Sequence, residues 1–141
     1  MTVAVTPHLN FRGQARKALE HYRSVFGGEA FAITHADTGR PVPAGEEGDI
    51  SWGQLVSAAG VRVMVYDVPS TDAWEPGTMT FFVSVRGTDA EEVRGYWEAL
   101  AADATVLVPL GPAPWAPLYG MLTDPFGVTW VLDVEAAWVS V

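Results

Sequence analysis

The chain contains no cysteine, and its eight lysine and arginine residues stand against 17 aspartates and glutamates. Without thiols there is no disulfide framework, no zinc site with thiolate ligands and no cysteine nucleophile, so we expect a reducing, cytoplasmic environment. No lysine or arginine follows Arg94, and the formal net charge is −9. Phosphate backbones and anionic membrane surfaces would be repelled, which argues against binding to nucleic acid or to a membrane.

Hydrophobic runs that could cross a membrane are also missing. The 20 residues at 104–123 carry no charge, but they include four prolines and two glycines. Proline removes helix hydrogen bonds that lipid cannot replace, so this stretch is predicted to form strands and a loop. Residues 1–11 lack the basic and apolar regions of a secretory signal. We therefore expect neither a membrane span nor a secretory leader.

The order of predicted elements repeats within the 141 residues, a length that suits one domain. Alternating apolar residues predict strands, and helical spacing predicts helices. Both halves read β-α-β-β-β, which predicts module one at about 1–68, a linker at 68–77 and module two at about 78–141 of a single domain, 1–141. Module one has strands at 3–11, 29–37, 49–58 and 61–67 and a helix at 13–26. Module two has a strand at 78–86, a helix opened by a Thr88–Glu91 capping box, a strand near 104–108 and a hairpin at 118–134.

The hairpin at 118–134 is the clearest element. Asp124 can accept hydrogen bonds from the backbone ahead of it, Pro125 presets the second turn position, and Gly127 takes a positive φ or a bulge. Alternation gives its second strand a core face and a more polar face, and the polar face is where a site is expected. The expected core residues are Trp130, Leu132 and Val134, and the opposite ones are Thr129, Val131 and Asp133.

Alternation also assigns faces in the strands that open each module. The expected core residues are Val3, Val5, Leu9 and Phe11 in the first strand and Met79, Phe81, Val83 and Val85 in the second. The segment 38–48 is rich in glycine, proline and glutamate, which indicates a mobile surface loop. Adjacent carboxylates in such a loop lack fixed geometry, so Glu46 and Glu47 are expected to be solvated.

Three segments carry a family resemblance: TPHLNF at 6–11, ALEHYRSVFGGEA at 18–30 and YGMLTDPFGVTW at 119–130. Together they resemble the PhnB-like branch of the vicinal oxygen chelate superfamily, the glyoxalase, bleomycin-resistance and extradiol dioxygenase group. The resemblance spans nearly the whole chain. It implies an α+β fold of paired βαβββ modules forming a curled sheet cup, usually in a homodimer. Relatives often have a methyltransferase-like name, but this sequence has no glycine-rich loop for S-adenosylmethionine.

The resemblance also implies where a metal ion would be held in the superfamily. Carried over by position, the ligand sites are His8, Met64 or Val65, Thr80 and Val131, and many relatives have a histidine where this chain has Trp52. Only His8 is a good ligand, whereas a divalent ion needs about three protein ligands. We therefore predict no metal and no other cofactor, with His8 as a hydrogen-bonded wall residue. His21 and His35 lie in no motif and are expected to be solvated or structural.

The aromatic residues are the remaining functional signal. Trp97 and Trp130 are expected in the core, whereas the other aromatics near the cup either line a pocket or fill it. No GxSxG, HExxH or P-loop motif occurs, so no catalytic residue is assigned. The predicted ligand-binding residues are His8, Asn10, Trp52, Gln54, Tyr66, Thr80, Phe82, Ser84, Trp115, Tyr119 and Met121.

The resulting prediction is a metal-free protein that binds an aromatic or cationic organic molecule, with a resistance role by sequestration. Anions are expected to bind poorly, because four of the eight basic residues belong to the first helix region. Two alternatives stay open: a metal-dependent lyase or dioxygenase using His8, and a dimeric scaffold with a filled cup.

Overall fold

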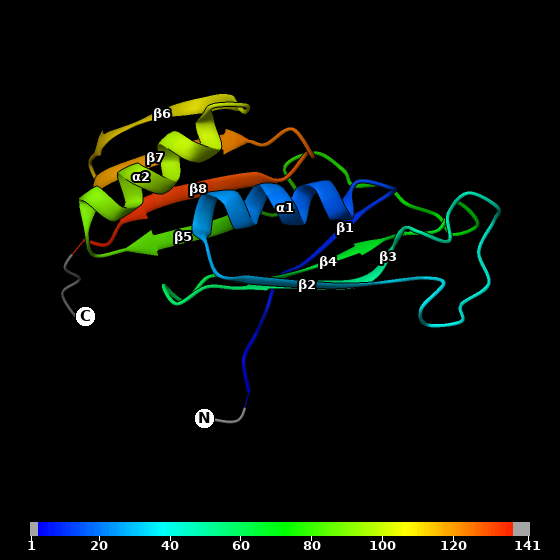
Figure 1. The fold of residues 1–141 in the computed structure, drawn as a ribbon. Coiled ribbons are helices and arrows are strands. Elements are labelled where there is room, and N and C mark those ends of the chain that lie inside the picture. The colour runs from blue at the N-terminus through cyan, green and yellow to red at the C-terminus, as the bar shows by residue number, and fades with distance from the viewer. Residues whose placement is uncertain (1–2, 137–141) are drawn as a thin grey trace. The chain divides into compact units, whose positions relative to one another are not determined.

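The computed structural model describes residues 3–136. The chain forms two compact units, Met1–Thr78 (unit 1) and Met79–Val141 (unit 2), and each has a helix and a curled four-stranded sheet (Figure 1). This confirms the predicted α+β fold class. Unit 1 contains β1 (His8–Phe11), α1 (Ala15–Phe26), β2 (Glu29–Thr34), β3 (Ile50–Val56) and β4 (Arg62–Asp67). Unit 2 contains β5 (Val83–Gly87), α2 (Ala90–Ala101), β6 (Thr105–Ala113), β7 (Ala116–Thr123) and β8 (Thr129–Val134).

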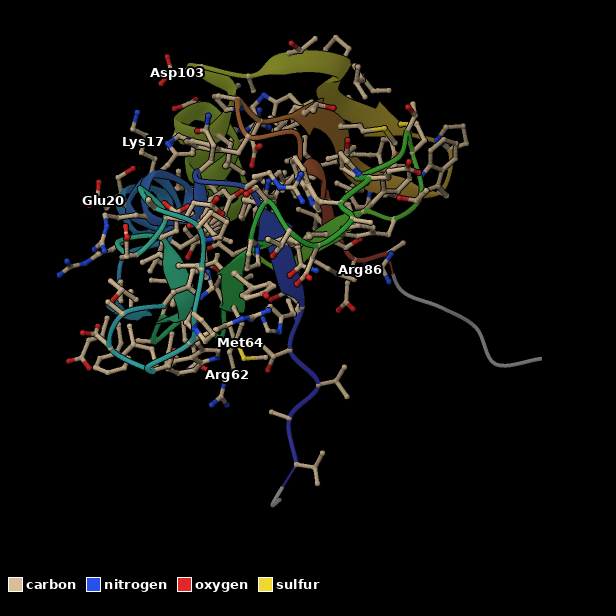
Figure 2. The ribbon with its side chains drawn as sticks, turned by 90° about the vertical axis from the view of Figure 1, so that its right-hand side faces the viewer. Lys17, Glu20, Arg62, Met64, Arg86 and Asp103 are labelled. Carbon is tan, nitrogen blue, oxygen red and sulfur yellow. The ribbon has the colours of Figure 1, made fainter. Side chains whose placement is uncertain are left out.

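The sheet of unit 1 has the order β1-β4-β3-β2, with β1 parallel to β4 and the other neighbours antiparallel. Helix α1 covers one side of it. Gly53 permits this close approach, because a Cβ atom there would lie 2.8 Å from Cγ2 of Val65 and 3.2 Å from Cδ2 of Leu19. The buried helix residues follow the predicted helical spacing: Ala15, Ala18, Leu19, Tyr22 and Phe26. On the outer side of α1, Lys17 and Glu20 point into solvent (Figure 2).

Asp67, at the end of β4, joins the strand to the start of α1. The residue is 2% exposed, and its carboxylate accepts hydrogen bonds from the backbone N–H groups of Gly13 at 2.8 Å, Ala15 at 3.0 Å and Ile50 at 2.9 Å. The two N–H groups at the helix start have no partner within the helix, and the positive end of the helix dipole favours a carboxylate there. A single buried charge therefore fixes α1 against β3 and β4.

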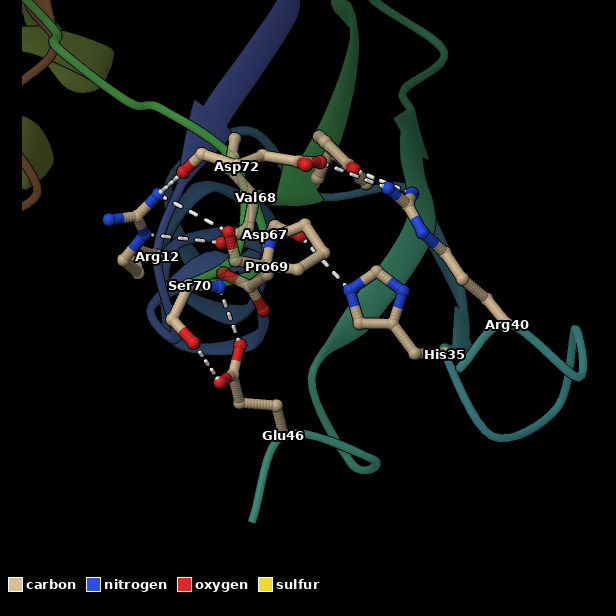
Figure 3. A network of polar contacts seen from close by, with 10 residues as sticks. Arg12, His35, Arg40, Glu46, Asp67, Val68, Pro69, Ser70 and Asp72 are labelled. Carbon is tan, nitrogen blue, oxygen red and sulfur yellow. Dashed lines mark hydrogen bonds and ion pairs between the residues drawn. The ribbon is translucent and has the colours of Figure 1, made fainter. Parts of the chain in front are cut away.

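The segment 68–72 binds the side chains of Arg12, Arg40 and Glu46 (Figure 3). Arg12 donates hydrogen bonds to the carbonyl oxygens of Val68, Pro69 and Asp72. Glu46 accepts hydrogen bonds from Ser70 N, at 2.8 Å, and from Ser70 Oγ, and these bonds lower the pKa of the Glu46 carboxyl below its usual value. Glu46 stays at the surface as expected, but its carboxylate also has a specific backbone and hydroxyl partner that was not predicted.

The sheet of unit 2 has the order β5-β8-β7-β6, again with a parallel outer pair, β5 and β8. Helix α2 covers one side of it, and Trp97 occupies the space above Gly120, where a Cβ atom would lie 2.8 Å from the indole. The N-cap of α2 is Asp89, whose side chain accepts a hydrogen bond from Glu91 N. The predicted Thr88 cap was off by one residue, because aspartate makes the same capping contact.

The hairpin of β7 and β8 forms as predicted. Asp124 Oδ1 accepts hydrogen bonds from the N–H groups of Phe126 and Val128, and Oδ2 accepts one from Trp130 Nε1 at 2.9 Å. Gly127 has a φ of 91°. The indole bond was not predicted. It ties the turn to the core, where Trp130 is completely buried.

The predicted and observed limits differ most in three strands. Val3 and Val5 are 80% and 97% exposed, because β1 begins only at His8 and the preceding residues extend beyond the start of β4. The strand expected from residue 78 begins at Val83, where pairing with β8 begins, so Met79 and Phe81 are exposed instead of core. The strand expected at 104–108 extends to Ala113, since an edge strand tolerates proline.

Both helices in the described range 3–136 are 12 residues long, and neither has the length and apolar character that a membrane crossing requires.

Candidate functional site

The side of the unit 1 sheet opposite α1, called here the unit 1 face, collects most of the residues predicted for module one. Gly53 and Val65 face α1 and are paired across the strands, so their neighbours along β3 and β4 point to the other side. Arg62 and Met64 lie on that side together (Figure 2). The unit 1 face consists of His8 and Asn10 of β1, Phe31 and Ile33 of β2, Trp52 and Gln54 of β3, and Arg62, Met64 and Tyr66 of β4.

The centre of the unit 1 face is an aromatic and thioether surface. The rings of Phe31 and Trp52 are tilted against each other with centroids 5.9 Å apart. The indole Nε1 of Trp52 donates to the sulfur of Met64 at 3.1 Å. Phe31 is 60% exposed, so the surface is not closed by other side chains of unit 1. A flat apolar molecule could lie on it.

The polar side chains that border this surface make no hydrogen bonds to other residues of the described chain. Within residues 3–136, the side chains of His8, Asn10 and Gln54 make no hydrogen bond to another residue. His8 and Gln54 flank Met64 in one cross-strand row, and Asn10 pairs with Tyr66 in the next. An apolar surface with a few polar groups available for bonding is the usual composition of a small-molecule site.

Tyr66 is held from three sides. The His8 and His35 rings lie nearly perpendicular to it, with centroid distances of 6.3 and 5.9 Å. Arg40 Nη1 donates to the phenol oxygen at 2.6 Å, and Arg40 Nη2 pairs with Asp72 Oδ2 at 3.2 Å. His35 is completely buried, with its Nε2 3.0 Å from the carbonyl oxygen of Asp67. Of the two roles expected for His35, the structural one is therefore correct.

The side of the unit 2 sheet opposite α2, called here the unit 2 face, holds a second group of predicted residues. Its most polar feature was not predicted: Arg86 binds Asp133 through Nε, at 3.2 Å, and Nη2, at 2.9 Å. Asp133 is 5% exposed, and its hydrogen bonds raise the pKa of Arg86 further above its usual value. Because Gly120 faces α2, register places the following residues on the unit 2 face: Ser84 and Arg86 of β5, Tyr119 and Met121 of β7, and Val131 and Asp133 of β8.

The remaining predicted residues lie outside the strands of unit 2. Trp115, between β6 and β7, contacts Tyr119 edge to face with centroids 5.2 Å apart, so it extends the unit 2 face. Thr80 and Phe82 precede β5, and the alternation that placed them beside Ser84 does not apply there. Met79, with a φ of 56°, interrupts the extended backbone.

The positions that the resemblance implies for a metal do not suit one. His8 is the one imidazole among them, the Met64 sulfur accepts a hydrogen bond from Trp52, and Val131 has no donor atom. In the described part of the chain, no three histidine, cysteine, aspartate or glutamate side chains are grouped in a way that could hold an ion. A divalent ion requires about three protein ligands, so this donor set does not fit a metal.

The sequence reasoning missed several residues of the two faces. Arg62, Met64 and Arg86 follow from the alternation that placed Tyr66 and Ser84, since each lies two or four residues away on the same strand. Arg40 could not be found in this way, because it lies outside the strands and its partner Asp72 is 32 positions away in the chain.

Comparison with known proteins agrees with this architecture. Residues 7–132 match the model of the Glyoxalase/Bleomycin resistance protein/Dioxygenase superfamily. Protein YjdN of Escherichia coli K12 is 25% identical over 138 residues, which cover 92% of this chain and 94% of YjdN. The crystal structure of PA1353 from Pseudomonas aeruginosa is similar with a TM-score of 0.82 and 31% identity, over 95% of this chain and 98% of that one. The PhnB protein from Bacillus cereus matches with a TM-score of 0.70 and 25% identity, over 94% of this chain and 100% of that one.

Proposed function

Because the chain belongs to the Glyoxalase/Bleomycin resistance protein/Dioxygenase superfamily and to its PhnB-like branch, we propose that it binds a small, flat organic molecule on the unit 1 face. Membership of the superfamily supports small-molecule binding in general. The single observation that supports this location is the exposed surface of Phe31, Trp52 and Met64, bordered by polar side chains without internal hydrogen bonds. Their availability suits a ligand that provides the missing partners.

Binding on this face would not depend on a metal ion. His8 is the one good ligand among the positions implied by the superfamily, and the neighbouring thioether of Met64 already accepts a hydrogen bond from Trp52. The role of His8 in this proposal is to form a wall of the site and to exchange a hydrogen bond with the ligand. The protein would hold its ligand without reacting with it, which is consistent with sequestration of a toxic or antibiotic compound.

The ligand class follows from the surface and from charge. Stacking on Trp52 and Phe31 would contribute about 0.5 to 2 kcal/mol per ring or cation contact. The net charge of −9 favours the approach of cations and disfavours that of anions. Of the arginines close to the faces, Arg40 and Arg86 are paired with aspartates, and within residues 3–136 only Arg62, at the exposed end of β4, has no such partner on the unit 1 face. A neutral or cationic aromatic molecule is therefore the proposed ligand.

Fluorescence titration tests the proposal. Tryptophan emission would be followed as proflavine, a flat cation, or 2-naphthoate, a flat anion, is added to the wild type and to Trp52→Ala. We expect proflavine to bind more tightly than 2-naphthoate, and Trp52→Ala to weaken proflavine binding about tenfold. Trp74→Ala is the matched control, because Trp74 packs against Arg12 and neither residue belongs to the strands of the unit 1 face.

Two results would contradict the proposal: tighter binding of the anion, or unchanged binding in Trp52→Ala. Elemental analysis of the purified protein tests the metal-free state separately. About one zinc, nickel, iron or manganese per chain, lost in His8→Ala, would overturn the metal-free state and favour the enzymatic alternative.

A further inference from the structure

Tyr66 has a hydroxyl proton for which the described part of the chain, residues 3–136, offers no acceptor. Its oxygen lies 2.6 Å from Nη1 of Arg40. A guanidinium has N–H donors and no acceptor, so the phenol oxygen is the acceptor in this bond. The O–H proton of Tyr66 therefore remains available for another partner.

The surroundings fix the direction of this hydroxyl before any ligand binds. The guanidinium carbon of Arg40 lies 5.7 Å from the centroid of the Tyr66 ring, and Asp72 holds the same guanidinium at 3.2 Å. The rings of His8 and His35 contact the phenol from other sides. A donor that is already oriented loses little conformational entropy when it binds an acceptor.

We propose that Tyr66 donates a hydrogen bond to a neutral acceptor oxygen, such as a carbonyl, at the edge of the flat ligand. This inference rests on the proposed function of the unit 1 face. Arg40 is the positioning residue for this bond. A hydrogen bond accepted from a cation polarises the phenol and makes its O–H a stronger donor. Asp72 balances the charge of Arg40, so the arrangement selects a neutral oxygen instead of a carboxylate.

A pair of compounds that differ by one oxygen tests this inference. 9-Fluorenone and fluorene have the same flat ring system, and 9-fluorenone adds a carbonyl. Equilibrium dialysis measures the dissociation constant of each, and their ratio reports the hydrogen bond. We expect the wild type to bind 9-fluorenone about tenfold more tightly than fluorene, and Tyr66→Phe to bind both equally. Tyr96→Phe is the control that keeps the ratio, since Tyr96 lies on α2 and bonds Glu92.

The same ratio of dissociation constants, fluorene to 9-fluorenone, tests the positioning role of Arg40. Arg40→Gln should reduce the preference for 9-fluorenone to about threefold, and Arg40→Lys should restore most of it, because an ammonium group also donates to the phenol oxygen. A merely structural role of Arg40 in the loop would weaken the binding of both compounds and leave the ratio unchanged.

The outcomes separate this inference from the proposed function. Equal binding of the two compounds by the wild type would overturn the role of Tyr66 and leave the unit 1 face as the binding site. Tighter binding of fluorene-9-carboxylate than of 9-fluorenone would overturn the neutral ligand class. Absence of binding by all three compounds would overturn both the inference and the proposed function.

Discussion

Asp67 and Asp124 are two buried carboxylates that occupy the ends of elements in different units. They are 2% and 4% exposed, and each accepts at least two hydrogen bonds from backbone N–H groups. The loss of such an acceptor leaves buried donors without a partner, which costs more free energy than a typical hydrogen bond contributes. Their importance at the residue scale is therefore structural, although acidic residues are usually exposed.

Replacement of Asp67 by asparagine should destabilise the protein by about 2–3 kcal/mol. The amide is nearly isosteric, but it has one acceptor oxygen where the carboxylate has two, so an N–H group of Ile50, Gly13 or Ala15 loses its partner. Urea unfolding at pH 7 gives the change in the free energy of unfolding. Asp103→Asn is the control at an exposed position (Figure 2), where the change should be within about 0.5 kcal/mol. Equal effects of the two substitutions would contradict this interpretation.

Asp49 is expected to make stability depend on pH in the opposite sense to most carboxylates. Burial, and then the nearby charges of Asp67 and Glu46, raise its pKa above the ordinary value of 3.8; Glu47 adds to this effect and His35 opposes it. The folded protein therefore binds this proton more tightly than the unfolded chain does. The resulting stability is present below pH 3.8 and is lost as the pH rises through the raised folded pKa.

Asp49→Asn should accordingly stabilise the protein at pH 7 and have a diminishing effect as the pH falls below 3.8. Urea unfolding of the wild type and the variant at pH 7, 5 and 3 measures the difference at each pH. The exposed Asp103→Asn variant again serves as the reference. A destabilised Asp49→Asn at pH 7 would show that the carboxylate has a favourable partner instead.

At the scale of elements, the correct predictions were those that rested on residues within the element itself. The β7–β8 hairpin contains its own turn residues, and α1 has a complete apolar stripe, so both formed as predicted. The ends of β1 and β5 depend on where their partners β4 and β8 begin, and alternation does not contain that information. The strands were thus found, but their limits were not.

The same substitution should have opposite effects in two elements of unit 2. Gly127→Ala should destabilise the hairpin by about 1–2 kcal/mol, because the φ of 91° is unfavourable for any residue with a Cβ atom. Gly95→Ala should stabilise α2 by about 1 kcal/mol, because alanine has the higher helix propensity. Apart from the adjoining backbone, no heavy atom lies within 4 Å of either added methyl group, so packing against other parts of the chain does not contribute. Thermal and urea unfolding of both variants measure the two signs, and the same sign for both would refute the backbone explanation.

At the scale of the whole molecule, we propose that the protein is a homodimer. The edge strand β6 exposes Val106, Leu107 and Val108, and an exposed apolar edge is a surface that a second copy can cover. Sedimentation equilibrium at micromolar concentration should give twice the chain mass of 15.2 kDa. Each copy has a net charge of −9, so added salt should screen the repulsion and strengthen the dimer. A mass of one chain at both low and high salt would contradict the proposal.

The sequence by itself determined the fold class, the two helices, the hairpin turn and part of the unit 1 face, namely His8, Asn10, Trp52, Gln54 and Tyr66. These depend on periodicity and on the local chemistry of Asp124 and Gly127, which act within a few residues of chain. The tertiary structure alone decided the limits of the strands, the burial of Asp67, the contact of Arg40 with Tyr66 and the Arg86–Asp133 pair. These contacts join residues 17 to 54 positions apart in the chain, and no local pattern records which distant groups will meet when the strands pair.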